Sequence, residues 1–215
     1  MTAPDAPWNP LIFEEDYLRV RAVPTCHTST FVWCHAKGQQ GGDWQFMVDP
    51  LRKLGHCNHI AFIFPYLNYS GEDGNGKNEA LVQKIVDAEI VKGCHPDRIA
   101  VGGYDEGLDV ALRAVLGDSK NTINGVLGVT EKLDVAIFEG LREAPNSQTP
   151  VYVVDRSSSA KAKSMLESMD LPARAYVVGS KKMASSVQLV TQEEFESLDK
   201  FIHESLPVEF AEQKN

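Results

Sequence analysis

The chain has 215 residues, of which 43% are hydrophobic and 24% are charged, as is typical of a globular domain long enough to bury a full core. Its net charge of -9 at pH 7 argues against nucleic acid and anionic membrane as partners, because both bind clusters of lysine and arginine. The sequence has no apolar run long enough to predict a transmembrane segment. We expect no signal peptide either, because residues 1–10 lack its charged and apolar regions.

Residues 1–21 come first and are predicted to be an irregular leader. Its apolar side chains are numerous enough to dock onto a surface, which is either the rest of the same domain or a partner protein. The candidates for such contacts are Trp8, Leu11, Ile12, Phe13 and Tyr17.

Uniformly apolar runs follow the leader, and such runs predict strands that are buried on both faces of a parallel sheet. Runs with helical spacing alternate with them. The strands are expected at residues 30–34, 59–64, 99–103, 123–129, 150–155 and 174–178. The helices are expected at residues 43–54, 78–92, 108–116, 134–141, 159–169 and 191–206.

Two of these helices have a recognisable start. Asp43 is the expected N-cap of the first helix. The last helix opens with a capping box formed by Thr191 and Glu194.

The alternation of strands and helices predicts an α/β fold, in which a mostly parallel central sheet carries helices on both faces. The chain shows no internal repeat and no linker that would divide it. We therefore predict an N-terminal leader at residues 1–28, a single domain at residues 29–207 and a short tail at residues 208–215.

Each of the four cysteines is next to a histidine, but no C-x-x-C or H-x-x-x-H spacing brings these pairs together as zinc ligands. We therefore predict free thiols in a reducing compartment, the cytoplasm, with an organelle as the alternative. We expect neither a metal site nor a cofactor. The cysteines are Cys26, Cys34, Cys57 and Cys94.

One tight turn stands out between the strand at residues 99–103 and the helix at residues 108–116. It reads G-Y-D-E-G, from Gly103 to Gly107. A strand, a sharp turn flanked by glycines and a helix are the context of the nucleophile elbow, G-x-S-x-G. The glycines predict the geometry of that elbow, but Asp105 stands where the serine would be.

The chain resembles the acyl-protein thioesterase/carboxylesterase family of α/β-hydrolases, which includes lysophospholipase-like members. The segment Gly93 to Gly107 is similar to a family stretch that ends in G-G-F-S-Q-G. The segment Phe31 to Gly38, F-V-W-C-H-A-K-G, is similar to the family's apolar strand followed by H-G-x-G, where the oxyanion hole begins. The resemblance covers residues 28–207 in order and implies an α/β-hydrolase fold.

The resemblance also implies a catalytic triad in the order Ser, acid, His. It places Asp105 at the nucleophile, Ser159 at the acid and Ala184 at the base. A small shift of the alignment restores no base, because no histidine lies between His95 and His203. A serine hydroxyl needs an adjacent base, and that base needs an orienting acid. All three parts of the acyl-transfer mechanism are therefore expected to be missing.

The oxyanion loop and the substrate wall are changed as well. In the loop formed by His35, Ala36 and Lys37, alanine replaces the family's glycine, and Glu106 replaces the glutamine after the nucleophile. A carboxylate at that point would repel an oxyanion. The loop at residues 66–77 is shorter than the family segment that helps to form the acyl groove.

Three functions are compatible with these changes in the sequence. The first is an inactive scaffold kept for contacts with other proteins, as a structural or regulatory subunit of a complex or large assembly, with a homodimer left open. The second is an ester or thioester hydrolase that uses Asp105 as nucleophile with a base foreign to the family, such as His35 or His203. The third is a non-catalytic binder of acyl chains or lipids.

Overall fold

The structure is a computed structural model of the full chain. It describes residues 11–23, 27–55, 57–70, 74–117, 119–131, 134–141, 143–156, 173–176 and 191–208.

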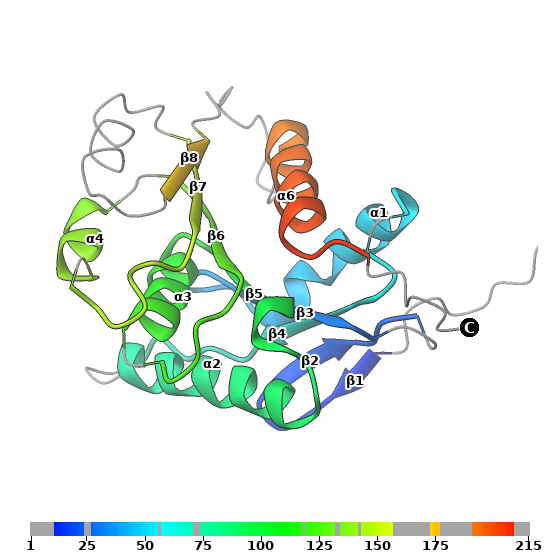
Figure 1. Ribbon diagram of the computed structural model, residues 1–215, viewed down its shortest axis with the longest axis horizontal. Helices are drawn as coiled ribbons and strands as arrows, with labels where there is room; N and C mark the ends of the chain where they lie inside the picture. Colours follow the sequence, from blue (N-terminus) through cyan, green and yellow to red (C-terminus); the bar gives the residue numbers. More distant parts are fainter. Residues whose placement is uncertain are drawn as a thin grey trace, which may run out of the picture.

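Within these residues, one sheet with the strand order β1-β2-β4-β3-β5-β6-β7-β8 forms the centre of the molecule (Figure 1). The pairs β1–β2 and β2–β4 are antiparallel, and every other neighbouring pair is parallel. This confirms the predicted α/β fold with a mostly parallel sheet. The strands are β1 Leu11–Phe13, β2 Tyr17–Val20, β3 Ser29–Cys34, β4 Ile60–Pro65, β5 Ile99–Tyr104, β6 Gly125–Thr130, β7 Val151–Asp155 and β8 Ala173–Tyr176.

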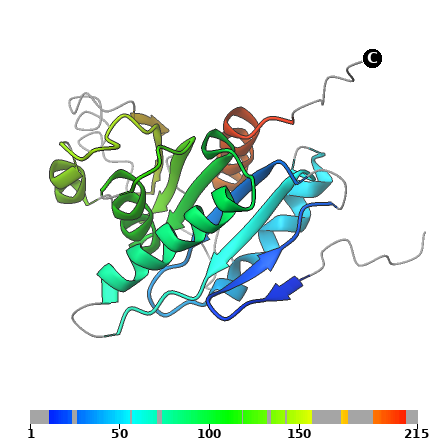
Figure 2. The same cartoon turned by 60° about the horizontal axis from the view of Figure 1, so that its bottom comes forward.

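Helices cover both faces of the sheet, and Figure 2 brings α2 to the front. The helices α2 Gly74–Val91, α3 Glu106–Leu116 and α4 Val135–Leu141 pack on one face. The 3₁₀ helix η1 Gly41–Met47 and the helices α1 Val48–Lys53 and α6 Gln192–Ser205 pack on the other. A short 3₁₀ turn, η2 Pro96–Arg98, leads into β5.

The strands feed two cores because alternate residues of a strand point to opposite faces. On β3, Phe31 and Trp33 belong to the core under η1, α1 and α6, whereas Val32 and Cys34 belong to the core under α2 and α3. Both sets are fully buried, which explains why these strands read as continuous apolar runs.

The prediction of an irregular leader is wrong for residues 11–13 and 17–20. These residues form the β1–β2 hairpin, which extends the sheet beyond β4. β1 is only three residues long, and Arg19 interrupts the apolar pattern of β2. Neither strand therefore carries the signal of a buried run.

Two predicted helix starts also differ. The first helical segment begins at Gly41, and Asp43 is its third residue rather than its N-cap. The Asp43 carboxylate accepts a hydrogen bond from the backbone N–H of Gln40 at 2.8 Å. Helix α2 begins at Gly74, earlier than predicted. The helix expected at residues 159–169 lies outside the described residues.

The capping box of α6 is confirmed. The Glu194 carboxylate accepts from the backbone N–H of Thr191 at 2.8 Å, and Thr191 Oγ1 accepts from the N–H of Glu194 at 3.2 Å. Across the described ranges, no helix combines the length and the apolar character needed to cross a membrane.

A buried cluster of charges joins the antiparallel end of the sheet to α2. Arg19 donates two hydrogen bonds to the Glu89 carboxylate, at 2.6 and 3.0 Å, and Lys92 donates another at 2.9 Å. The Glu89 side chain is only 1% exposed. Burial alone would raise the pKa of Glu89, but the hydrogen bonds and charges of Arg19 and Lys92 outweigh it and bring the pKa to about 2.

Replacing Glu89 with alanine is expected to lower the free energy of unfolding by about 3–5 kcal/mol, because Arg19 is then buried without its counter-charge. Denaturant titration followed by circular dichroism measures this change. The matched control is Asp87→Ala, which removes an exposed carboxylate from the same helix and should change stability by about 0.5 kcal/mol or less. An equal effect of the two substitutions would contradict the prediction.

The same ion pair predicts the sign of a pH effect. The pKa of Glu89 is lower in the folded chain than its ordinary value of 4.5. The stabilisation it provides is therefore present above pH 4.5 and is lost as the pH falls toward 2. The wild-type chain should lose more stability across this window than Glu89→Ala does.

Candidate functional site

The elbow is present and holds Asp105 in a strained conformation. β5 ends at Tyr104 and α3 begins at Glu106, so Asp105 forms the whole turn between them. Its φ of 46° and ψ of -117° are rare for a residue with a side chain and carry about 1–3 kcal/mol of strain. Backbone hydrogen bonds hold it there, from Asp105 N–H to Val129 O at 3.0 Å and from Leu108 N–H to Asp105 O at 2.8 Å.

The two glycines of the elbow are required by close backbone packing. A Cβ at Gly103 would lie 2.5 Å from the backbone nitrogen of Leu108, and a Cβ at Gly107 would lie 2.7 Å from the carbonyl oxygen of His35. Neither distance leaves room for a carbon atom. Helix α3 therefore rests directly on the backbone at the end of β3, whatever residue occupies the nucleophile position.

The carboxylate of Asp105 is tied to the end of β6. Its Oδ1 accepts from the backbone N–H of Glu131 at 2.7 Å and from the hydroxyl of Thr130 at 3.1 Å. Burial raises the pKa of Asp105, and the charges of Glu131 and Glu106 add to this, while the two hydrogen bonds oppose it. The carboxylate at the nucleophile position therefore already accepts hydrogen bonds from a backbone N–H and a hydroxyl of the same chain.

The oxyanion loop is filled by acceptors from the same chain. The backbone N–H of Lys37 donates to the Glu106 carboxylate at 3.3 Å, and the N–H of Ala36 donates to Gln39 Oε1 at 3.1 Å. Gln39 Oε1 is itself fixed by Trp44 Nε1–H at 3.0 Å. A hydrolase would direct donors of this loop at a substrate oxyanion. Here their partners are a side-chain amide and a carboxylate.

His35 is a neutral structural residue in this arrangement. The backbone N–H of Leu67 donates to its Nε2 at 3.1 Å, so the ring proton is on Nδ1 and is donated to Ala36 O at 2.9 Å. Tyr69 O–H donates to the His35 carbonyl at 2.5 Å. Burial also lowers the pKa of His35. The ring joins the loops after β3 and β4, and Asp105 is not among its partners.

The other alternative base, His203, lies on the exposed side of α6. The partners that the structure gives the Asp105 carboxylate are Thr130 and Glu131, neither of them a histidine.

A buried arginine links residues at the ends of β5, β6 and β7. Arg156 follows β7 directly, and its side chain is 6% exposed. It forms a bidentate pair with the Glu194 carboxylate, with Nε–Oε1 at 2.5 Å and Nη2–Oε2 at 2.8 Å. Its Nη1 donates to the hydroxyl of Tyr104 at 2.5 Å and to the carboxylate of Glu131. The hydrogen bond to Glu194 is the main cause that raises the pKa of Arg156 further above its already high ordinary value.

Sequence reasoning did not single out this arginine. The available signal was an arginine directly after an apolar strand, together with the glutamate of a capping box, but nothing in the order of residues pairs the two. The pair matters because it anchors α6 to the edge of the sheet at which the family's acid is expected.

The remaining predicted positions are placed as follows. Ser159, Ala184 and Trp8 lie outside the described residues. Leu11, Ile12 and Phe13 are on β1, and Tyr17 is on β2. Cys34, Cys57 and Cys94 are buried free thiols. In the part of the chain that the structure describes, no three His, Cys, Asp or Glu side chains are grouped as metal ligands.

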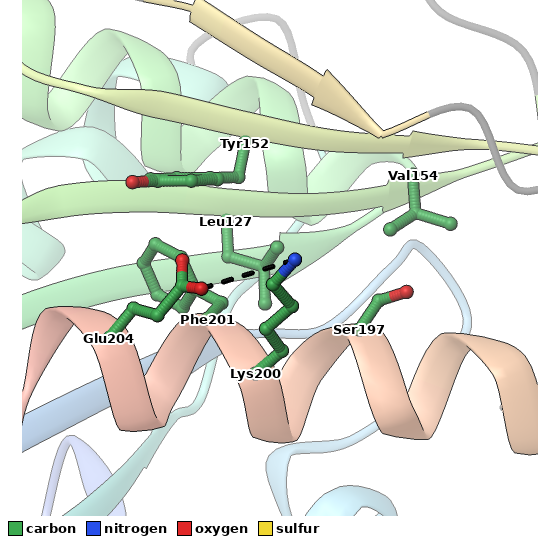
Figure 3. Close-up of a pocket in the computed structure, with 7 residues that line it drawn as sticks. All are labelled: Leu127, Tyr152, Val154, Ser197, Lys200, Phe201 and Glu204. Atoms are coloured by element: carbon green, nitrogen blue, oxygen red, sulfur yellow. Dashed lines mark ion pairs between the residues drawn. The ribbon is translucent and has the colours of Figure 1, made fainter.

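An apolar hollow lies between α6 and the strands β6 and β7 (Figure 3). The volume of this hollow that water can occupy is about 20 Å³, which holds roughly one water molecule. Lys200 and Glu204 form an ion pair at its rim, with Nζ–Oε1 at 3.9 Å. Asp105 does not line this hollow. Its lining residues are Leu127, Tyr152, Val154, Ser197, Lys200, Phe201 and Glu204.

No family model matches the chain. Among curated proteins, it is similar to acyl-protein thioesterase 1 of Schizosaccharomyces pombe, with 26% identity in an alignment 180 positions long that covers 67% of this chain and 79% of the relative. It is also similar to acyl-protein thioesterase 1 of Neurospora crassa, with 22% identity in an alignment 227 positions long that covers 88% of this chain and 92% of the relative.

Solved structures share the fold. Esterase PE8 matches with a TM-score of 0.68 and 18% identity, over 87% of this chain and 97% of its own. Arabidopsis thaliana SOBER1 matches with a TM-score of 0.63 and 15% identity, over 83% and 99%. The elbow geometry, the sheet topology and the solved structures show an α/β-hydrolase fold, and the curated relatives support the resemblance to the acyl-protein thioesterase/carboxylesterase family.

Proposed function

We propose that the chain is a catalytically inactive member of this family that acts through contacts with other proteins, as a structural or regulatory subunit. The observation that carries the proposal is the state of Asp105. It stands at the nucleophile position without a hydroxyl, and its carboxylate is bound to Thr130 and Glu131. Acyl transfer by this fold starts from a serine hydroxyl activated by a histidine.

The electrostatics of the elbow support the same proposal. An acyl-transfer site must stabilise negative charge that develops on the substrate. At this elbow, Asp105, Glu106 and Asp109 bring three carboxylates to the start of α3, and Glu106 already accepts from the loop N–H of Lys37. A substrate oxyanion would meet repulsion where the family provides donors.

A second candidate function is hydrolysis with Asp105 as nucleophile, and the strained elbow that still presents this residue favours it. That mechanism requires a base to activate the hydrolytic water. His35 cannot serve without rearrangement, because its Nε2 lone pair already accepts from Leu67. We therefore rank this function below the inactive scaffold. Acyl-chain binding is ranked lower still, because none of the residues that line the apolar hollow of Figure 3 belongs to the elbow.

The purified chain is expected to show no turnover of short or long acyl esters and thioesters, the substrate class suggested by the names of its relatives. Hydrolysis is measured by release of a chromogenic alcohol or thiol, with Asp105→Ala as the matched control for any residual rate. Turnover that Asp105→Ala abolishes would overturn the proposal in favour of the aspartate nucleophile.

Restoring the serine alone is not expected to restore reactivity. Asp105→Ser should remain unlabelled by a fluorophosphonate probe, because the resemblance puts Ala184 at the base position and the described partners of the Asp105 side chain, Thr130 and Glu131, include no histidine. An active serine esterase treated in parallel controls for the probe. Labelling of Asp105→Ser at a comparable rate would show that a base is present at the elbow.

The crowded carboxylates predict a stability effect at Asp109. Burial and the charge of Asp134, with smaller effects of Glu106 and Asp105 opposed by Arg113, raise the pKa of Asp109 from 3.8 to about 6. Ionised Asp109 therefore destabilises the folded chain above pH 6, and stability should rise as the pH falls through 6 toward 4.

Asp109→Asn is accordingly expected to be more stable than wild type at about pH 7.5 and to show less change between about pH 7.5 and pH 5. Thermal unfolding at both pH values measures this, with Asp87→Asn on the exposed side of α2 as the control. A variant that is less stable than wild type at the higher pH would refute the assignment.

A further inference from the structure

We infer that the outer edge of β1 is a docking site for an extended, basic segment of a partner protein, which adds a strand to the sheet. The inference rests on the proposed function, because it names a surface through which an inactive family member would contact other proteins. β1 lies at the end of the sheet beyond β2, and no described residue pairs with its outer edge (Figure 2).

The hairpin's hydrogen bonds decide which backbone groups of β1 point outward. The N–H of Glu14 donates to Tyr17 O at 3.0 Å, so the backbone of Glu14 faces β2. In an antiparallel pair, residues whose backbone groups face the partner strand alternate with residues whose groups face away. Ile12 therefore also faces β2. The N–H and C=O groups of Leu11 and Phe13 point away from β2, as two donors and two acceptors spaced for an incoming strand.

The side chains of the same two residues are exposed. Leu11 is opposite Val20 and Phe13 is opposite Leu18, and directly opposite residues share a face of the sheet. Leu18 and Val20 are buried in the core under η1 and α1, whereas Leu11 is 40% exposed and Phe13 is 74% exposed. The apolar face of the sheet thus continues past its helical cover. An added strand would extend this face by one more row of side chains.

Not every apolar residue predicted for the leader belongs to this surface. Ile12 and Tyr17 are only partly exposed, and Tyr17 packs against the core under α2. The docking edge therefore consists of Leu11 and Phe13, with the turn that follows them.

The charged residues near this edge indicate which kind of partner segment would bind there. Glu14 and Glu15 directly follow β1 and are exposed, while β1 itself carries no charge. An extended partner segment with alternating apolar residues and a flanking lysine or arginine would match both features. A second copy would instead bring another acidic turn and a further net charge of -9.

The test uses the full chain and a defined probe. The probe is a fluorescent peptide of alternating valine and threonine with two lysines at each end, and fluorescence anisotropy measures its binding. We expect saturable binding that weakens at least tenfold with Phe13→Ala or when the lysines of the probe are replaced by glutamates. Val91→Ala, which shortens an 87% exposed side chain at the end of α2, is the matched control and should bind as wild type does.

Backbone pairing is tested separately with two N-methylated versions of the probe. In a paired strand, alternate amides of the probe face β1. Methyl groups on the amides that face β1 should abolish binding, and methyl groups on the amides that face away should leave it intact. Equal binding of the two versions, no saturable binding of the basic probe, or no effect of Phe13→Ala would each overturn the inference.

Sedimentation velocity measures self-association of the same samples. Dimerisation that Phe13→Ala abolishes would identify a second copy as the occupant and overturn a basic partner. Hydrolysis that depends on Asp105 would overturn the proposed inactivity but not peptide binding at β1. A failed peptide experiment would leave the inactivity untouched, so the two failures are distinguishable.

Discussion

The contact between α3 and the end of β3 determines the geometry of the whole carboxyl edge. At Gly107 the helix backbone approaches so closely that a Cβ would lie 2.7 Å from the carbonyl oxygen of His35. This approach places Glu106 within hydrogen-bonding distance of the loop after β3 and forces the strained turn at Asp105. Packing alone requires this contact. The chain therefore has the elbow geometry although Asp105 stands where the G-x-S-x-G pattern has serine.

The polar groups at this edge of the sheet are engaged within the chain. The loop donor at Lys37 binds a carboxylate, the ring of His35 binds two backbone groups, and Arg156 binds Glu194 beside β7. Such internal satisfaction removes the unpaired polar groups that would otherwise favour binding of a ligand. The polar groups of the elbow therefore stabilise the loops around it.

Much of this architecture could be predicted from sequence because parallel strands buried on both faces read as apolar runs, as β3, β4 and β5 do. The elbow glycines were readable from their spacing. The β1–β2 hairpin was not, because Arg19 looks like a surface residue until its partner on α2 is known. Arg156 was missed for the same reason, since its partner Glu194 is 38 positions away and only the fold brings them together. Long-range charge pairs leave no local pattern.

The separation between Arg19 and Glu89 also has a consequence for synthesis. The two residues are 70 positions apart, so at about 5–20 residues per second the carboxylate is made roughly 4–14 seconds after the arginine. During that interval β4 is made, but the Glu89 counter-charge of Arg19 does not yet exist. A solvated guanidinium in the middle of β2 opposes premature burial of this segment and delays its docking until α2 has emerged from the ribosome.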